Sequence, residues 1–343
     1  MVWKFWVGLG YVCLLLWTAA TTAADSGETA YDRLRALRDD YHRPEAVPFP
    51  DDNPYSPAKA ALGRALFFDP ALSNSGSQSC ASCHRPDLSW ADGRGRALGD
   101  SGGVMALRSP TLLNVAWTPR LGWDGKFRDL EAVAFAAITG PANMNLPEAE
   151  ALGRLSTRPG YTSAFAEVFG DGAITRRRVE LSLATYERTI VSGDAPFDRW
   201  IAGDERAIDD AAQRGFALFN GRARCSACHS GWAFTDGSFH DIGTARGDDA
   251  GRGRMFPSSL KLRYAFKTPT LRDVAVRAPY MHDGSVPTLE AVIELYNNGG
   301  IERPSRSELI RRLELTDGEK SDLIAFLRTL TALHDSTPAP GAP

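Results

Sequence analysis

Two short segments of the chain, CASCH at Cys80–His84 and CSACH at Cys225–His229, share the pattern C-x-x-C-H. This pattern is the attachment signature of c-type haem, in which two thiols bond to the vinyl groups of one porphyrin and the histidine is held where its imidazole can reach the iron. A single match could also be a redox dithiol or half of a zinc site. Two matches predict two covalently bound haems c, with His84 and His229 as the proximal iron ligands.

Cysteine usage supports this assignment. The haems would be attached through four of the five cysteines: Cys80, Cys83, Cys225 and Cys228. The fifth, Cys13, lies in an N-terminal segment that has an early lysine, an apolar run from Phe5 to Trp17 and small residues up to Ala24. This order is typical of a secretory signal peptide, here residues 1–24, and predicts export to the periplasm. An uncleaved anchor is the alternative, but the run is shorter than the about 20 residues that a membrane span needs, so no stable span is expected after cleavage.

The composition of the 343 residues is that of a globular protein, with 43% hydrophobic and 24% charged residues. The formal net charge of −3 gives no electrostatic reason to expect nucleic acid as a partner. The segment HDSTPAPGAP at 334–343 is expected to be a disordered tail.

The two C-x-x-C-H segments belong to an internal repeat. LGRALFFD at 62–69 precedes the first, and RGFALFNG at 214–221 precedes the second. Beyond the motifs, SPTLLNVAWTPRLGWDG at 109–125 aligns without gaps with TPTLRDVAVRAPYMHDG at 268–284. Since only two copies exist, the repeat predicts two related domains in tandem and not a solenoid.

The pattern between the motifs indicates the fold class. Strand-like alternation is scarce, and amphipathic helical segments such as 179–191 alternate with loops rich in glycine and proline. A turn-rich crossover at 192–209 follows the first copy. We therefore expect a mainly α protein made of two tandem c-type cytochrome domains, each with one covalent haem, at residues 45–200 and 201–333.

The repeat is asymmetric where it would face the irons. Continuing the alignment without gaps, LEAVAFAAI at 130–138 superimposes on LEAVIELYN at 289–297, so that Ala137 corresponds to Tyr296. A phenolate oxygen can coordinate iron and a methyl group cannot. The register predicts that Tyr296 is an iron ligand of the second haem, while the first haem keeps an open face. The alternative is that Tyr296 is a core aromatic residue.

The same alignment sets Trp123, in WDG, against His282, in HDG. A tryptophan beside the open haem could relay an electron between the irons, although packing in the core would also explain a large aromatic residue. His282 and His240 could be further iron ligands or could simply form hydrogen bonds within the scaffold.

Four blocks carry a family resemblance: LGRALFFDPALS, SPTLLN…WDG, GRARCSACHSG and TPTLRDVAVRAPYMHDG. In them the chain resembles the bacterial di-haem cytochrome c peroxidase family and, within it, the MauG-like branch, over roughly 57–330. The resemblance implies a mainly α periplasmic enzyme. H2O2 would react at the N-terminal haem, the C-terminal haem would transfer electrons, and Trp123 would lie between them. Typical peroxidases of the family have a distal methionine where this chain has Tyr296, as in MauG.

A phenolate is a harder, anionic ligand than a thioether, so it should lower the potential of the second haem. MauG-like enzymes use H2O2 and a pair of high-valent haems to oxidise tryptophans of a partner protein, and this is the activity that the resemblance implies. One alternative is a cytochrome c peroxidase that takes electrons from a small cytochrome c or cupredoxin. A second alternative is a non-enzymatic electron-transfer cytochrome.

The expected peroxide pocket departs from the family pattern. The family places a glutamine and a glutamate around the peroxide, and the matching residues here are Val133 and Asn143, with Ala137 in the same pocket. A glutamate could act as general acid–base, whereas Asn143 can only hydrogen-bond. The resemblance therefore points to Trp123, Val133, Ala137 and Asn143 as the catalytic region but leaves the proton-transfer group open.

The resemblance also bears on a Ca²⁺ ion that bridges the haem domains in the family. One of its ligands there is an asparagine side chain, and this chain has Arg108 at that position. The remaining ligands would be the backbone carbonyls of Arg277 and Pro279. A cation beside Arg108 is disfavoured by charge repulsion.

Overall fold

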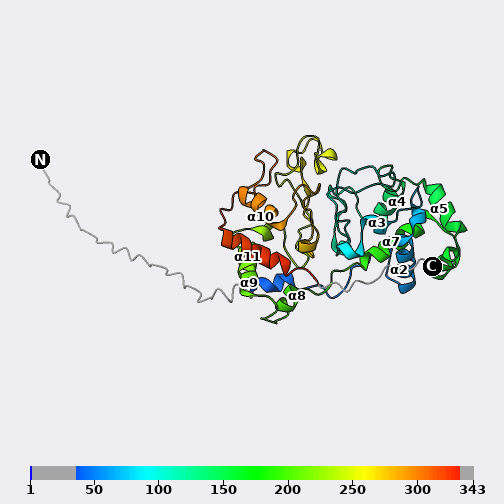
Figure 1. Ribbon diagram of the computed structural model, residues 1–343, viewed down its shortest axis with the longest axis horizontal. Coiled ribbons are helices and arrows are strands. Elements are labelled where there is room, and N and C mark those ends of the chain that lie inside the picture. Colours follow the sequence, from blue (N-terminus) through cyan, green and yellow to red (C-terminus); the bar gives the residue numbers. More distant parts are fainter. Residues whose placement is uncertain (2–35, 333–343) are drawn as a thin grey trace.

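The computed structural model describes residues 36–332 together with Met1. The rest of the expected signal peptide and the expected tail at 334–343 lie outside the described residues. The described part consists of helices joined by long irregular loops (Figure 1). Two-residue strands, β1 (Phe239–His240) and β2 (Phe266–Lys267), form a small antiparallel ladder. The prediction of a mainly α protein is confirmed, and none of the described helices is long and apolar enough to cross a membrane.

Figure 1 shows the helices in two lobes. The first lobe contains α2 (Pro57–Phe68), α3 (Cys80–Cys83), α4 (Glu131–Thr139), α5 (Glu148–Thr157), α6 (Tyr161–Phe169) and α7 (Arg176–Arg188). The second contains α8 (Pro196–Ile201), α9 (Asp210–Asn220), α10 (Leu289–Asn298) and α11 (Asp317–Arg328). Short 3-10 turns complete the loops: η1 (Asp39–Tyr41), η2 (Pro70–Leu72), η3 (Pro86–Leu88), η4 (Val115–Trp117), η5 (Cys225–Ala227), η6 (Arg252–Arg254), η7 (Leu260–Leu262) and η8 (Val274–Val276).

Local sequence explains where the helices before the motifs begin. The Ser56 hydroxyl accepts a hydrogen bond from the Lys59 amide at 3.2 Å, and Pro57 occupies the first turn of α2. A carboxylate does the same for α9, since Asp209 accepts from the Ala212 amide at 2.8 Å. Such caps satisfy amides that have no partner within the helix.

Each lobe is built on a close helix crossing. Helix α2 packs against α7, and α9 packs against α11. The crossings occur at Gly63 and Gly215, which correspond in the sequence repeat. A Cβ atom at Gly63 would lie 1.9 Å from the carbonyl oxygen of Ser182, and one at Gly215 would lie 2.0 Å from that of Asp322. Only glycine permits these backbones to approach so closely, so the two lobes have the same kind of glycine-mediated helix contact.

Two clusters of buried apolar side chains underlie the lobes. The first joins α2, α4, α5, α6 and α7 around residues such as Phe67 and Phe135. The second is rich in aromatic rings, among them Phe216 and Phe326, whose centroids lie 5.5 Å apart. Phe197 of α8 belongs to this second cluster, so this helix, which lies within the expected crossover at 192–209, packs with the second lobe.

The lobes meet through corresponding segments. The Arg108 amide donates to the His282 carbonyl at 3.0 Å, and the Lys267 amide donates to the Trp123 carbonyl at 2.8 Å. Arg108 corresponds to Lys267 in the repeat, and Trp123 corresponds to His282. The exchange is therefore reciprocal, as expected when two similar units are related by an approximate two-fold axis.

Candidate active site

One cavity of about 1010 Å³ is lined by residues of both lobes. Its volume is at the upper end of the roughly 300–1,000 Å³ typical of small-molecule and cofactor sites. All the side chains predicted from the sequence line it: Cys80, Cys83, His84, Trp123, Val133, Ala137, Asn143, Cys225, Cys228, His229 and Tyr296. The structure thus brings both C-x-x-C-H motifs and the two differing LEAV segments to one continuous space.

The four cysteines of the motifs are free thiols. Cys80 and Cys83 lie at the two ends of the single turn that forms α3, and Cys225 begins η5 in the second lobe. Burial raises the pKa of Cys80 and of Cys225 to about 12, which keeps both thiols protonated at neutral pH. Unpaired thiols on the wall of a cavity fit attachment of a porphyrin there.

Both motif histidines are oriented by backbone carbonyls. Nδ1 of His84 lies 3.3 Å from the Trp90 carbonyl oxygen, and Nδ1 of His229 lies 2.9 Å from that of Phe234. A carbonyl only accepts, so Nδ1 carries the proton and Nε2 keeps its lone pair. Burial also lowers the pKa of both histidines, which favours the neutral form that binds iron.

Helix α10 carries Tyr296 on the cavity wall of the second lobe. The helix begins at a Thr288 cap and ends at Gly299, where φ is +79°. The Tyr296 hydroxyl has no hydrogen-bond partner among the described residues, and burial raises its pKa. A phenol on the cavity wall whose hydroxyl has no described protein partner is suited to a ligand role in the cavity.

The corresponding position in the first lobe carries Ala137, whose methyl group has no ligand atom. Helix α4 places Val133 and Ala137 one turn apart on the cavity side. Asn143 follows the helix, and its backbone amide donates to the Gly140 carbonyl at 2.8 Å. The side chains of Val133, Ala137 and Asn143 neither bind iron strongly nor exchange a proton. This part of the cavity is therefore suited to a small ligand.

Trp123 is fixed by contacts to both lobes. Its indole N–H donates to the Arg108 carbonyl at 3.0 Å, and its own carbonyl accepts from the Lys267 amide at 2.8 Å. The side chain is partly buried and lines the cavity. The structure therefore places the Trp123 ring at the seam between the lobes, on the wall of the shared cavity.

Glu187, on α7, is a cavity residue that the sequence reasoning missed. Burial raises the pKa of its carboxyl to about 8, against the attraction of Arg188 and with a smaller repulsion from Glu131. The carboxyl has no hydrogen bond or ion pair to any described residue. The matching residue of α11 is Leu327, which also lines the cavity. Aligning α7 with α11, the helices that pack on Gly63 and Gly215, shows that a glutamate in the first lobe replaces a leucine in the second.

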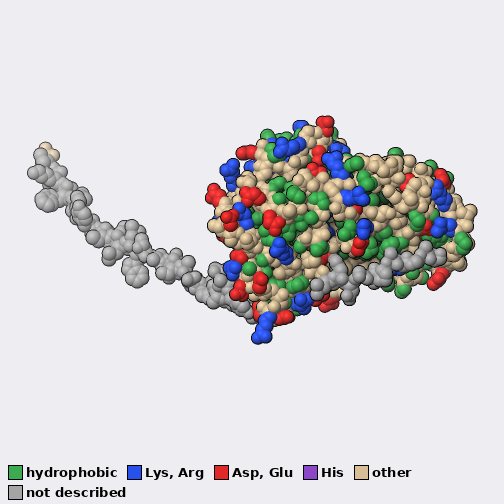
Figure 2. Space-filling model, in the orientation of Figure 1, with side chains coloured by type: hydrophobic (Ala, Val, Ile, Leu, Met, Phe, Trp, Pro, Cys, Tyr) green, Lys and Arg blue, Asp and Glu red, His purple; other side chains and the backbone are tan. Residues whose placement is uncertain are grey.

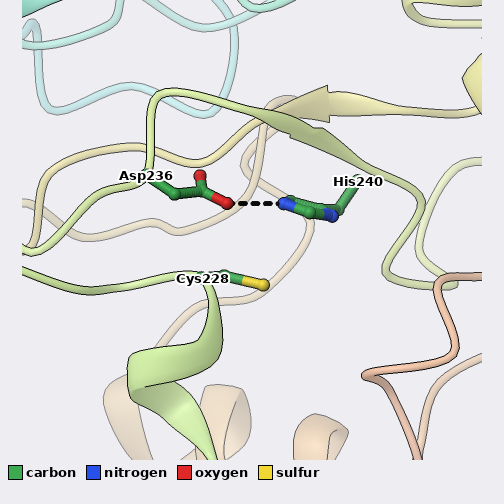
Figure 3. A group of neighbouring side chains, drawn as sticks. All are labelled: Cys228, Asp236 and His240. Atoms are coloured by element: carbon green, nitrogen blue, oxygen red, sulfur yellow. Dashed lines mark hydrogen bonds and ion pairs between the residues drawn. The ribbon is translucent and has the colours of Figure 1, made fainter.

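Figure 3 shows Cys228, Asp236 and His240, whose possible ligand atoms lie within 4.8 Å of one another. Nε2 of His240 is 2.8 Å from an Asp236 carboxylate oxygen. The Cys228 sulfur belongs to the CSACH motif, and a thioether bond to haem would leave too few ligands for a metal ion. The Asp236–His240 pair is therefore best described as part of the scaffold.

His282 is likewise bound to a carboxylate. Its Nε2 lies 2.6 Å from an Asp249 oxygen, and its ring stacks on Phe266 with centroids 3.7 Å apart. Like His240, this histidine is engaged by a carboxylate partner in the wall, and it stands where the first lobe has Trp123.

The residues expected around Ca²⁺ do not fit that ion. The Arg108 guanidinium donates to the Arg277 carbonyl at 3.0 Å, so a positive group already engages one of the oxygens that the ion would need. Ca²⁺ requires 6–8 oxygen ligands, typically including carboxylates. No Ca²⁺ is therefore assigned to this seam.

Comparisons with known proteins agree with this geometry. The family model for di-haem cytochrome c peroxidase matches residues 57–206. Methylamine utilization protein MauG of Methylorubrum extorquens is 51% identical over 316 residues, covering 92% of this chain and 89% of the relative. MauG of Methylophilus methylotrophus is 47% identical over 305 residues, covering 88% and 91%. The crystal structure of a MauG-like protein associated with microbial copper homeostasis superposes with a TM-score of 0.79 at 31% identity, covering 84% and 94%.

The fold, the paired motifs and these relatives define the class: the chain belongs to the di-haem cytochrome c peroxidase family. Within the family it lies in the MauG-like branch, as the sequence resemblance predicted. It is a di-haem peroxidase or oxidase, and its cofactors are haems.

Proposed function

We propose that this protein is a periplasmic MauG-like oxidase that uses H2O2 to oxidise residues of a partner protein. The observation that carries the proposal is the pairing of Tyr296 and Ala137, which line one cavity from corresponding places in the two lobes. A phenol in the second lobe and a methyl group in the first give the two sites different chemistry. The expected export signal and the c-type motifs support a periplasmic location.

We assign one covalent haem to each of two domains, which the sequence places at residues 45–200 and 201–333, and we include α8 with the second domain because it packs in the second cluster. The four free thiols would hold the porphyrins, with His84 and His229 as proximal ligands and Tyr296 as the distal ligand of the second haem. When bound, haem supplies the peroxide and one-electron chemistry that protein side chains lack. The apolar lining of the cavity excludes water from that chemistry.

The first lobe is suited to H2O2. Val133 and Ala137 line the cavity, and neither side chain could compete with H2O2 for the iron of a bound haem. The Asn143 side chain can donate a hydrogen bond that orients a peroxide oxygen, but it cannot carry a proton from one oxygen to the other. Glu187, whose pKa is raised to about 8, is a cavity carboxyl of this lobe that can hold an exchangeable proton near neutral pH.

Oxidation of a partner protein must occur at a distance. A cavity of about 1010 Å³ is of a size for cofactors and small molecules and not for a folded polypeptide. Electrons must therefore leave the partner and cross the protein wall, and Trp123 provides an indole that is held by both lobes. On the face drawn in Figure 2, acidic and basic side chains are interspersed, so this face has no single sign of charge to select a partner.

A second candidate is a cytochrome c peroxidase that takes electrons from a small cytochrome c or cupredoxin. Tyr296 argues against it, because a methionine ligand at that place would raise the potential of the entry haem and a phenolate would lower it. The ferric protein should show one high-spin and one low-spin haem and should form a long-lived oxidised species with one equivalent of H2O2. Rapid steady turnover with reduced cytochrome c would instead favour the peroxidase, and two low-spin haems that ignore H2O2 would contradict both.

A further inference from the structure

Two cations lie at the seam between the lobes: Arg108 is buried and Lys267 is half-buried. Arg108 and Lys267 correspond in the repeat, each followed by one hydroxyl residue and then Pro-Thr-Leu, and both line the cavity. Arg108 is only 7% exposed. The backbone amides of these two residues make the reciprocal bonds to His282 and Trp123, so the two side chains start from equivalent places on either side of the seam.

The two side chains also reach across the seam in the same manner. A terminal guanidinium nitrogen of Arg108 donates to the Arg277 carbonyl at 3.0 Å, and the Lys267 ammonium donates to the Arg120 carbonyl at 3.0 Å. Each cation thus contacts one backbone oxygen of the opposite lobe. One carbonyl satisfies a single donor, whereas an ammonium has three and a guanidinium has five.

Neither cation has an anionic partner of its own. No described carboxylate forms an ion pair with Arg108 or Lys267, and Nε of Arg108 is buried without a hydrogen-bond acceptor. Burial lowers the pKa of Lys267 to about 8, with only a smaller opposing effect from Asp124. A buried charge without a counter-charge is strongly unfavourable, so Arg108 calls for an anion from within the cavity. The half-buried ammonium of Lys267 offers a matching charge on the other side of the seam.

We propose that Arg108 and Lys267 are the positions at which the lobes bind the propionate carboxylates of their haems. The inference rests on the two-haem assignment made under the proposed function. Each haem carries two propionates, which need cationic or hydrogen-bonding partners in an apolar cavity. Arg108 still has Nε and other guanidinium N–H groups to offer, which suits a planar carboxylate, while Lys267 offers a point charge.

This arrangement would also place the relay tryptophan. The Arg108 carbonyl accepts from the Trp123 indole, and the Lys267 amide donates to the Trp123 carbonyl. The residues that bind the propionates are therefore the residues that hold Trp123. Binding of both haems would fix their edges relative to this ring, which is the geometry that electron transfer between the lobes depends on.

The test uses the full holoprotein and two charge-removing variants, Arg108→Gln and Lys267→Gln. Arg120→Gln is the matched control, since Arg120 is exposed at the same seam and the acceptor that it offers to Lys267 is a backbone carbonyl. Reduction potentials are measured by spectroelectrochemical titration, and propionate vibrations by resonance Raman spectroscopy. Haem content is measured on the same samples.

Both test variants should retain two haems, shift a propionate band and lower a haem potential, because losing a nearby positive charge favours the ferric state. The Arg120→Gln protein should match the wild type. Shifts in both test variants no larger than in this control would overturn the inference. Fewer than two haems in the wild type would contradict the proposed function, and this inference with it.

If a glutamine variant does not fold, Arg108→Lys and Lys267→Arg serve in its place. They keep the charge but exchange a planar fork for a point donor, so the propionate band should shift while the potential changes little. An unchanged propionate band in both exchange variants would contradict the inference as directly as unchanged potentials.

Discussion

Tyr296 on α10 and Ala137 on α4 line the same cavity from corresponding positions of two similar lobes. The lobes share a helix crossing at glycine, a C-x-x-C-H motif and a histidine oriented by a backbone carbonyl. Their difference at this one position is therefore a difference in chemistry and not in fold. On our proposal, the phenol gives one lobe an iron ligand, and the methyl group gives the other lobe room for a small oxidant.

Replacing Trp123 by phenylalanine should slow electron transfer between the two lobes. The variant loses the indole bond to Arg108 and an aromatic ring that is readily oxidised. We expect partner-protein oxidation in single-turnover experiments to fall by about tenfold or more, equivalent to ~1.4 kcal/mol in the barrier, while H2O2 still reacts at the first lobe.

Trp117→Phe is the control for that variant, because Trp117 also lines the cavity but packs on Trp232, with centroids 4.8 Å apart. Equal loss of activity in both variants would show that no particular tryptophan carries the electron.

Glu187 should give the protein a pH-dependent stability. Its folded-state pKa of about 8 lies above the ordinary value of 4.5, so between these values the folded protein keeps a proton that the unfolded chain has lost. The resulting stabilisation is complete below about pH 4.5 and is lost as the pH rises toward 8. Glu187→Gln should reduce the pH dependence of the free energy of unfolding between about pH 4.5 and 8, as measured by denaturant titration of the holoprotein at several pH values.

Glu131→Gln provides the contrast. Although burial opposes ionisation, hydrogen bonds from Arg188 and Asn53 hold the pKa of Glu131 below its usual value. Its stabilisation is therefore present above the unfolded pKa and is lost in acid, so this variant should be destabilised at neutral pH. If the free energy of unfolding of Glu187→Gln changes with pH as it does in the wild type, the Glu187 carboxyl of the wild type ionises as in water.

The glycine crossings should resist even one added methyl group. Gly63→Ala and Gly215→Ala place a Cβ about 2 Å from a carbonyl oxygen of the opposing helix, so the helices must separate. Overpacking of this kind costs about 1–3 kcal/mol in the free energy of unfolding. Gly153→Ala in α5 has open space around its Cβ and should be neutral or stabilising by up to ~1 kcal/mol. Similar melting temperatures for all three variants would refute the close crossing.

Calcium should not stabilise this protein, because Arg108 already donates to the Arg277 carbonyl. The melting temperature of the holoprotein should be the same with a chelator and with added Ca²⁺. Arg108→Asn removes the guanidinium and should make the seam less stable. A marked rise of the wild-type melting temperature with Ca²⁺ would contradict our assignment of the seam.

The sequence predicted the mainly α fold because paired motifs and helical periodicity are local patterns. Gap-free alignment of the LEAV segments also set Ala137 against Tyr296, and both lie on the cavity wall. Glu187 escaped detection because its role depends on how α7 crosses α2, which no local pattern records. The reciprocal reach of Arg108 and Lys267 likewise requires the two lobes to be docked, since each side chain bonds a carbonyl distant in sequence.

Electron paramagnetic resonance of the ferric protein, before and after Tyr296→Phe, bears most directly on the proposed asymmetry. The wild type should show one high-spin and one low-spin haem, and the variant should show two high-spin haems because the phenolate oxygen is gone. Persistence of the low-spin signal in Tyr296→Phe would show that another group binds the second iron and would contradict the account.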